Sequence, residues 1–532
     1  MSTPQTTICI CSGVRLDNSY KHSIWFDNLN DQSTYFYGKV VKTFEDYSYC
    51  RKNWSIKLHA TIAKARSWSY LFFDNPEDLK TYYYFITDVQ YINDETVEVF
   101  LEMDVIQTYL FEMRLLPSFV ERETPRTDEI GENTLDEGLD LGQYTIRYME
   151  DVEDLQDLLV MTMASVDLSM TDFPNTLEGD DFGQVYSGLK IFATDMTHNK
   201  IKVALDELSA KNKLDAIVSM WCYPKALVSI NNTGGAGSIL EPEFVFNEVM
   251  SSDSLEVNDL SLPKDLIGYT PRNKKLLSYP YIFLQASNNM GNTADFRFER
   301  FEDSNPKFVI YGSIFPDGAV KLIPCNYNGI DRNHEESLTL SGYPTCAWTG
   351  DTYKIWLAQN QNQRNVQGVT NALTMGGGAV MGLAGLATLN PLMIGSGVTM
   401  AGHGLTAIAG QIAQREDMKT YPPQSRGSQN ASVNAVNGQL TFTFYVKCIT
   451  EDQARIIDDY FTLYGYKCQQ VKTPSIHNRE LFTYTKTIGC TVAGEFCNED
   501  KNKISSIFDN GVTFWTNGDL IGEYGETNGF LD

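Results

Sequence analysis

One long stretch of the chain carries no formal charge, and it limits what the protein can fold into. From Asn365 to Gln414 there is no Asp, Glu, Lys or Arg, although these residues make up 21% of the whole sequence. Glycine, alanine and bulky apolar residues fill the stretch, and Asn390-Pro391 interrupts it as a turn would. Each arm beside that turn is close to the ~20 residues of a bilayer-spanning helix. Gly378-x-x-x-Gly382 is a minimal motif for close helix packing.

Three interpretations of this uncharged stretch remain open. It is a segment that is hidden in one state and enters a membrane in another, a helical hairpin buried in a soluble protein, or a glycine-rich loop. A permanent membrane span is disfavoured, because the glycines lower helix propensity and the sequence before the stretch is polar. Under the first interpretation the candidate membrane-active residues are Met381, Leu383, Leu386, Leu389, Pro391, Leu392, Met393, Ile394, Val398, Leu405 and Ile408.

The rest of the chain predicts a β-rich protein with few helices. Aromatic residues make up 12% of the sequence, chiefly Tyr and Phe, which favour strands. Residues 96–104 alternate, with Val97, Val99 and Leu101 on one face and acidic residues on the other, which indicates a half-buried strand. A chain of 532 residues is too long for one hydrophobic core, so either two or three domains or one elaborated β-rich domain with insertions is expected. Further strands are expected at 82–88, 279–285, 296–301, 307–315, 319–323 and 439–448, and helices at 200–213, 351–365 and 451–463.

The helix expected at 451–463 has an apolar stripe. Ile456, Ile457, Tyr460 and Phe461 recur at helical spacing, so this side is expected to face the core. The ten cysteines are sparse for a chain of this length and form no CxxC pair, so buried free thiols are expected. The amino-terminal residues lack the basic and apolar regions of a secretory signal.

Charge and motifs exclude several classes of function. The net charge of −26 argues against gripping nucleic acid, because phosphate binding requires Lys and Arg, but a negative wall lets a polyanion slide past. The six histidines show no zinc-binding spacing, and neither a GxSxG elbow nor a Walker lysine occurs. Acidic pairs such as Asp136-Glu137 do not indicate a catalytic site, because such pairs are abundant in a chain with 68 acidic residues. We therefore expect no enzyme, no catalytic residue, no cofactor and no metal site.

Several short stretches carry a family resemblance through their order and spacing. In chain order they are Asp104–Phe111, Asp136–Leu139, the amide-rich Gln359–Arg364, the uncharged stretch, Tyr421–Gln424, Tyr464–Tyr466 and Ile507–Trp515. Together they resemble the tail-knob (distal tail tube) proteins of small, Salas-type short-tailed phages of Gram-positive bacteria. The resemblance runs from about Val14 to the C-terminus and is weakest at about 150–270.

The resemblance implies a fold and an assembly. It implies a mixed α+β, β-rich chain with tail-tube and hub-like β-barrel modules, assembled as a homohexameric ring. The implied domains are 1–148 as the first part of a tube domain, 149–272 as a middle insertion and 273–364 as a return to the tube. Residues 365–421 would form an uncharged loop, and 422–532 the C-terminal part of the tube domain.

The resemblance also implies a function. The protein, made in the host cytoplasm, would sit at the distal end of the virion tail and conduct the genome during ejection. Its loops would plug the channel and then perforate the host cytoplasmic membrane. Its partners would be other copies of itself, upper tail and collar proteins, and double-stranded DNA that passes without specific binding. Two alternatives stay open: a receptor-binding or cell-wall-degrading tail protein, and a monomeric soluble protein.

Overall fold

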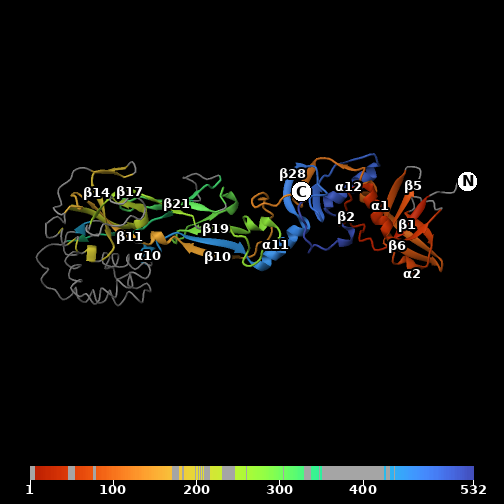
Figure 1. Ribbon diagram of the computed structural model, residues 1–532, viewed down its shortest axis with the longest axis horizontal. Helices are drawn as coiled ribbons and strands as arrows, with labels where there is room; N and C mark the ends of the chain where they lie inside the picture. The colour runs from red at the N-terminus through yellow and green to blue at the C-terminus, as the bar shows by residue number, and fades with distance from the viewer. Residues whose placement is uncertain are drawn as a thin grey trace. The chain divides into compact units, whose positions relative to one another are not determined.

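The chain folds into two compact units, each built from separate parts of the sequence. The computed structural model describes residues 6–45, 54–75, 79–170, 179–182, 185–197, 199–201, 203, 205, 208, 216–230, 246–258, 260–303, 305–328, 337–346, 348–349, 425–426, 432–436 and 438–531. Unit 1 comprises 1–143, 265–281 and 449–532, and unit 2 comprises 144–264 and 282–448. Elements from both ends of the chain, red and blue in Figure 1, therefore share unit 1.

The first sheet of unit 1 has six antiparallel strands in the order β3-β1-β5-β6-β7-β4. Along β7 the side chains of Val97, Val99, Leu101 and Met103 are buried and those between them are not, as the alternation predicts. The strands are β1 (Thr7–Cys11), β3 (Val40–Phe44), β4 (Ser55–His59), β5 (Tyr70–Asn75), β6 (Lys80–Asn93) and β7 (Thr96–Met103). Three helices pack against this sheet: α1 (Leu29–Gly38), α2 (Ile62–Ala65) and α3 (Val105–Tyr109).

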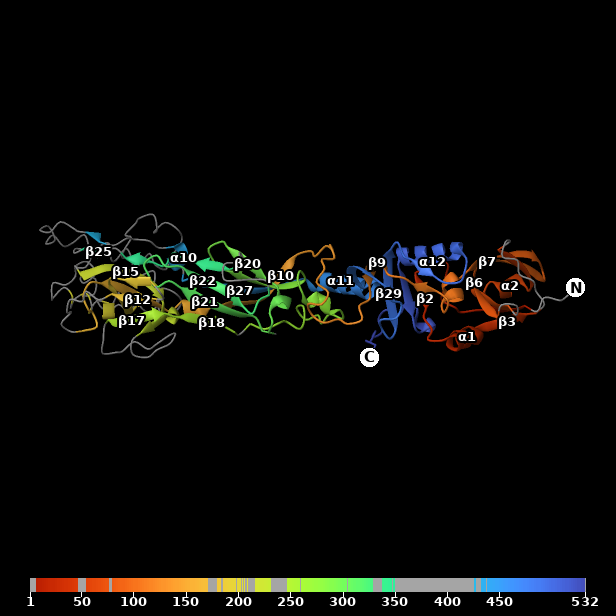
Figure 2. The same cartoon turned by 90° about the horizontal axis from the view of Figure 1, so that it is seen from above.

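The second sheet of unit 1 joins the chain's N-terminal and C-terminal parts. Its order is β2-β31-β29-β9-β28, and the β2–β31 pair is parallel. These strands are β2 (His22–Ile24), β9 (Ser118–Glu123), β28 (Tyr466–Lys472), β29 (Phe482–Ile488) and β31 (Val512–Trp515). Helix α12 (Asn498–Asn510) packs along β29 (Figure 2). Phe508 and Trp515 are buried in one hydrophobic core together with strands of the first sheet. A small pair, β8 (Arg114–Leu115) and β30 (Val492–Ala493), and helix α11 (Glu451–Tyr464) complete this part of unit 1.

Unit 2 contains three main sheets. The orders are β10-β27-β19-β20, β16-β17-β14-β11-β15-β24 and β18-β21-β22-β23. The strands of the first are β10 (Tyr144–Asp151), β19 (Ile282–Ser287), β20 (Thr293–Phe296) and β27 (Thr443–Ile449). Those of the second are β11 (Leu158–Ala164), β14 (Lys190–Asp195), β15 (Ile217–Pro224), β16 (Val228–Ile230), β17 (Asn247–Ser252) and β24 (Thr345–Cys346). Those of the third are β18 (Ser254–Val257), β21 (Lys307–Gly312), β22 (Val320–Cys325) and β23 (Leu338–Leu340). Short pairs are β12 (Asp180–Phe182) with β13 (Val185–Ser187) and β25 (Trp348–Thr349) with β26 (Ser425–Arg426); α10 spans Val433–Val436.

The β-rich mixed α+β class predicted from the sequence is confirmed. Eight of the cysteines within the described ranges are free, as expected, and five of these eight are buried. The described residues among 199–208 are helical, and the helix expected at 351–365 lies outside the described residues. The predicted five-part domain division stays a prediction; the two units divide the chain elsewhere and place 282–448 with 144–264.

Two predictions about local structure were wrong. The strand expected at 296–301 ends at Phe296, and a turn of 3-10 helix follows at Phe298–Arg300. Buried Phe298 and Phe301 are three residues apart, a spacing that suits such a turn and not a strand. On α11 the expected core residue Ile456 is 62% exposed, while Asp458 is fully buried beside Ile457 and Phe461.

Candidate functional site

The candidate membrane-active residues cannot be placed within the structure. Residues 365–421, including every one of the apolar side chains named above, lie outside the described residues. Among the described residues, no helix is both long enough and apolar enough to cross a membrane. The same residues contain no group of three or more His, Cys, Asp or Glu arranged to hold a metal ion.

The two ends of the segment that contains the uncharged stretch are held together. Strands β25 and β26 pair antiparallel, with Trp348 opposite Arg426 and Thr349 opposite Ser425. Just before β25, strand β24 pairs with β15 of the six-stranded sheet, with Thr345 opposite Trp221. The two ends of the segment 350–424 therefore meet at one place. We call the β25–β26 pair the neck.

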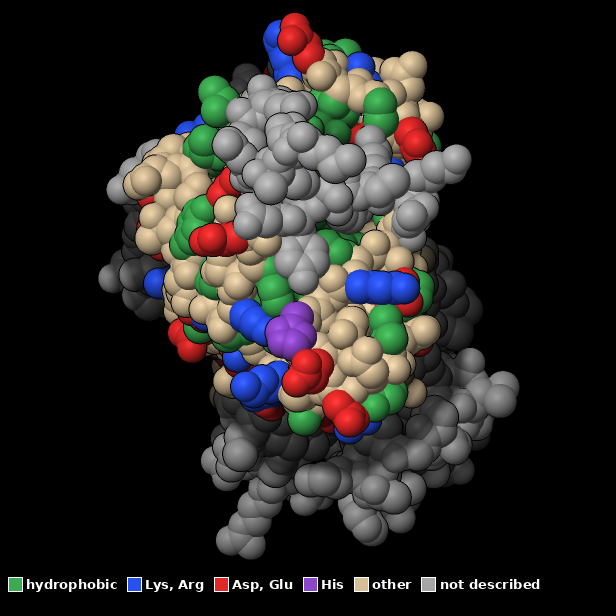
Figure 3. Space-filling view, turned by 90° about the vertical axis from the view of Figure 1, so that its right-hand side faces the viewer, with side chains coloured by type: hydrophobic (Ala, Val, Ile, Leu, Met, Phe, Trp, Pro, Cys, Tyr) green, Lys and Arg blue, Asp and Glu red, His purple; other side chains and the backbone are tan. Residues whose placement is uncertain are grey.

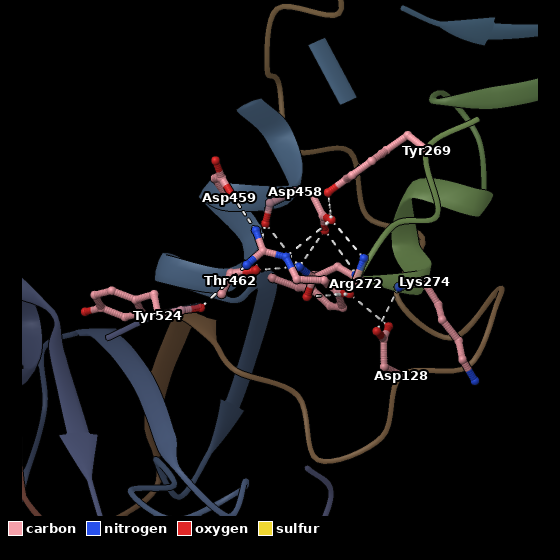
Figure 4. A network of polar contacts seen from close by, with 10 residues as sticks. Asp128, Tyr269, Arg272, Lys274, Asp458, Asp459, Thr462 and Tyr524 are labelled. Carbon is pink, nitrogen blue, oxygen red and sulfur yellow. Dashed lines mark hydrogen bonds and ion pairs between the residues drawn. The ribbon is translucent and has the colours of Figure 1, made fainter. Parts of the chain in front are cut away.

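A second feature of the molecule is a buried polar cluster in unit 1, whose residues all lie within the described ranges. Asp458 on α11 forms its centre (Figure 4). Its carboxylate accepts hydrogen bonds from Tyr269 Oη at 2.5 Å, from the backbone N–H of Arg272 at 2.8 Å and of Asn273 at 3.1 Å, and from Asn273 Nδ2 at 2.7 Å. The neighbouring Asp459 is exposed and pairs with the Arg272 guanidinium. One buried carboxylate thus fixes the backbone of the segment 265–281.

Glu137 is the other anion of the cluster and bridges two buried cations. Its carboxylate accepts from Arg122 Nη1 at 2.6 Å, from Lys275 Nζ, and from the backbone N–H of Lys467 at 3.0 Å. The side chains of Glu137 and Lys275 are 0% and 2% exposed. Burial lowers the pKa of Lys275, and the nearby Glu137 carboxylate opposes that shift. Such a group of charges is stable only when every partner is present.

Asp128 completes the cluster from the segment that precedes Glu137. It accepts from the backbone N–H of Lys274 at 2.9 Å and from Tyr466 Oη at 2.9 Å. Burial raises its pKa, although these hydrogen bonds act against the shift. Three separate stretches of sequence, around residues 122–137, 269–275 and 458–467, are therefore joined by charged and polar contacts.

A glycine permits the close approach within this cluster. Gly465 follows α11 with a φ of +61°, and an added Cβ would lie 2.2 Å from the carbonyl of Glu123. Arg122 donates to the carbonyl oxygen of Gly465 at 2.7 Å. Gly465 and Tyr466 belong to the stretch Tyr464–Tyr466, and Glu137 belongs to Asp136–Leu139. Two stretches that carried the family resemblance therefore serve this cluster.

The cluster has the chemistry of a structural clamp. Its carboxylates are engaged by backbone N–H groups, hydroxyls and cations of the same unit. Sequence reasoning did not find Asp458, Glu137 or Lys275 as partners. No local signal exists for them, because Asp458 and Asn273 are separated by 185 residues and Lys275 and Glu137 by 138.

The described acidic and basic side chains do not form separate patches at the N-terminal end of the chain. In the face shown in Figure 3, acidic and basic side chains are interspersed, and hydrophobic side chains stand in small groups. Ion pairs on the surface of unit 1, such as Lys39–Asp519 and Lys503–Glu102, fit this mixture. The described side chains on this face therefore form no patch of one charge.

Comparison with known families gives two matches along the chain. Residues 245–529, more than half of the sequence, match the family described as "Bacillus phage phi29, Tail knob protein gp9, C-terminal domain". Residues 4–114 match "Caudoviral major tail protein N-terminus". The N-terminal match covers the six-stranded sheet of unit 1.

Individual proteins are similar along nearly the whole chain. The tail knob protein gp9 of Bacillus phage B103 is 26% identical, and that of Bacillus phage phi29 is 25% identical, each over 98% of both chains. A solved structure, that of the bacteriophage C1 tail knob protein gp12, covers 97% of this chain and 98% of its own with a TM-score of 0.66 at 14% identity. That likeness concerns the fold alone.

Proposed function

This chain belongs to the family of the Bacillus phage phi29 tail knob protein gp9, and on that premise we propose that six copies form the distal tube of a short phage tail, through which the genome leaves. The membership makes the chain a structural component of the virion tail, as its relatives are named. The hexamer, the conduit and the membrane step described next belong to the proposal.

The charge of the chain supports a conduit. The net charge of −26 leaves few sites at which a polyanion would stick, and acidic side chains on a channel wall would repel the DNA backbone. The DNA would pass without specific binding, and the upper tail and collar proteins would hold the proximal end of the tube.

The neck is the structural observation that supports the membrane step of the proposal. Because β25 and β26 pair, the two ends of the segment 350–424 lie side by side, which supports the proposal that this segment is a closed loop and not a linker between distant parts of the chain. The loop contains the uncharged stretch, whose apolar side chains cannot stay in water without being covered. We infer that the channel stores these loops before infection and that they insert into the host cytoplasmic membrane as helical hairpins, whose backbone groups are satisfied internally.

The ring is tested by negative-stain electron microscopy and mass measurement of the purified full chain. We expect sixfold rings of six chains with a lumen wider than ~20 Å, enough for a duplex with the groove dimensions of B-form DNA. A monodisperse monomer under all conditions, including in the presence of the other tail proteins, would contradict the ring.

The loop is tested by replacing residues 350–424 with Asn-Gly. Thr349 and Ser425 are partners, so a two-residue type I′ turn closes the hairpin without moving the neck. We expect the shortened chain to assemble as before and to lose the release of dye from liposomes. A full-length control with Leu386→Asp and Ile394→Asp keeps the loop length and should lose dye release as well. Leakage that survives both changes would refute the membrane step.

A further inference from the structure

A short strand attaches the chain to the six-stranded sheet of unit 2 just before the neck. Strand β24 is two residues long and is the last strand in the order of that sheet. It pairs with β15, where Thr345 lies opposite Trp221. One position further along, the backbone N–H of Cys222 donates to the carbonyl oxygen of Pro344 at 2.8 Å. We call residues 343–346 the strap.

The strap and β15 place four side chains on one buried face of this sheet. Residues opposite each other on paired strands share a face, and every second residue of a strand returns to it. The side chains that share this face are Trp221, Tyr223, Tyr343 and Thr345. The two tyrosine rings agree with this arrangement, since their centroids are 5.9 Å apart. In chain order the four side chains are 1%, 1%, 4% and 3% exposed.

Each of these four side chains buries a polar atom that has no hydrogen-bond partner among the described residues. The atoms are Trp221 Nε1, the hydroxyl oxygens of Tyr223 and Tyr343, and Thr345 Oγ1. They are four of the nine such atoms in the described part of the chain. A buried polar group without a partner carries a cost of desolvation, which is recovered when the group meets water. Detachment of the strap therefore returns free energy that detachment of a fully hydrogen-bonded edge strand does not.

Close packing opposes this cost and holds the strap in place. An added Cβ at Gly312 would lie 1.8 Å from Tyr223 Oη, so this hydroxyl sits against the end of β21. The chain enters the strap through Gly342, whose φ of +86° is a left-handed conformation that suits glycine. The carbonyl oxygen of Gly342 accepts from the backbone N–H of Ser432 at 3.2 Å. The strap is therefore held by the packing of its side chains and begins at a residue with its own attachment.

We propose that the strap is a release device: it stays on β15 while the loop is stored and detaches when the loop enters the membrane. The four polar groups then gain water as a partner. Detachment also lengthens the reach of one arm of the loop, by up to about 3.3 Å for each extended residue of the strap. The inference rests on the proposed membrane step, which it makes specific by naming the contact that breaks.

Hydrogen exchange of the full chain tests the strap directly. The chain is measured alone and with dye-loaded liposomes of phosphatidylcholine and phosphatidylglycerol. The backbone N–H of Cys222 donates to the strap, so its exchange reports detachment. We expect this amide to exchange at least about tenfold faster once dye release begins, because its partner has left. The amides of β11, which pairs with the other side of β15, should keep their rates.

This measurement separates the strap from the membrane step. Dye release without faster exchange at Cys222 would overturn the strap and leave the membrane step standing. Equal acceleration throughout β11 and β15 would also overturn the strap, because the whole sheet would then open. The absence of dye release from the natural chain would refute the membrane step and the strap together.

Substitutions that remove the unpartnered atoms test the physical cause. Tyr223→Phe, Tyr343→Phe and Thr345→Val in one chain keep the shapes of the side chains and remove three of the four atoms. None of these changes adds an atom next to Gly312. We expect dye release to slow by at least about tenfold, because detachment no longer recovers the cost of those groups. An unchanged rate of dye release in this variant would overturn the strap.

A matched control removes unpartnered hydroxyls from the other face of the same sheet. Thr162 lies opposite Met220, the neighbour of Trp221, and Thr194 shares its face. Both hydroxyls are buried without a partner among the described residues. Thr162→Val with Thr194→Val should therefore leave dye release within about twofold of the natural rate, since neither group meets water when the strap detaches. Equal slowing in the control and in the triple variant would overturn the strap.

Discussion

The two units of this protein differ in how far their buried polar groups are hydrogen-bonded. In unit 1 the buried carboxylates of Asp458 and Glu137 each hold several donors from distant parts of the chain. Unit 2 has seven of the nine buried polar side-chain atoms that lack a hydrogen-bond partner among the described residues. They belong to Thr162, Asp180, Thr194, Trp221, Tyr223, Tyr343 and Thr345.

The difference shows what each unit gains from its polar groups. An unpartnered buried hydroxyl costs free energy, and a satisfied buried charge group fixes one geometry without adding much net stability. In unit 1 the fixed geometry is that of the segment 265–281, which leaves and rejoins unit 2. In unit 2, Trp221 and Thr345 lie opposite each other at the base of the neck. In unit 1 the buried polar contacts therefore fix the geometry of the segment 265–281, whereas in unit 2 the unpartnered polar groups cost stability.

The largest effect is expected at Glu137. Glu137→Gln removes the anion that Arg122 and Lys275 share and leaves two buried cations unpaired. We expect unit 1 to lose about 3–5 kcal/mol of unfolding free energy, because a broken buried pair costs that much. Hydrogen exchange followed by mass spectrometry measures the stability of each unit separately. Glu129→Gln, which breaks the exposed pair with Lys274, should cost under about 1 kcal/mol. Equal losses in the two variants would contradict the comparison.

The second prediction concerns pH and Asp104, the buried N-cap of α3. Burial raises the pKa of Asp104 to about 6, although hydrogen bonds from Gln107, Tyr70 and Ile106 act against it. A carboxyl with a raised pKa in the folded state stabilises the protein below the pKa of the unfolded chain. That contribution is lost as pH rises through about 6, and two pKa units correspond to roughly 3 kcal/mol.

Asp104→Asn removes this titration while keeping an acceptor for the helix cap. Urea unfolding of unit 1 between pH 4 and 7 should therefore show a flatter dependence on pH in the variant than in the natural chain. An unchanged slope would show that Asp104 does not titrate in this range.

The third prediction uses two adjacent aspartates on α11. Asp458→Asn replaces one acceptor oxygen by an amide that faces the N–H groups of Arg272 and Asn273, so unit 1 should lose about 2 kcal/mol. Asp459→Asn removes only an exposed ion pair and should stay within about 0.5 kcal/mol. Hydrogen exchange of residues 265–281 is the measurement, and exchange that speeds up equally in both variants would argue against a clamp.

The smallest effect compares the same substitution in each unit. Thr162→Val in unit 2 removes a buried hydroxyl without a partner, so stability should be unchanged or rise by up to about 1 kcal/mol. Thr485→Val in unit 1 removes a fully buried hydroxyl that donates to the carbonyl of Ser475, and should cost about 1 kcal/mol. Thermal melting, combined with hydrogen exchange of each unit, measures whether each substitution raises or lowers stability. Two losses of stability of equal size would contradict the difference between the units.

Much of the fold and part of the family assignment could be predicted from local sequence. The alternation of Val97, Val99 and Leu101 predicted β7, because the two-residue period of a strand depends only on neighbours. The helix at 451–463 was predicted for a similar reason. Its core face was misjudged, because Asp458 is buried by partners from another part of the chain and Ile456 has no such partner.

The sequence by itself determined that the chain is β-rich and acidic, and that it carries one uncharged stretch within the order of motifs shared by tail knob proteins. These properties follow from composition and from spacing along the chain. Only the tertiary structure decided that Asp458 and Glu137 form a clamp, that Trp348 pairs with Arg426 to close the neck, and that Trp221 lies opposite Thr345 at the base of the neck. The physical reason is distance along the chain, because strand pairing and charge burial join residues that no local pattern relates.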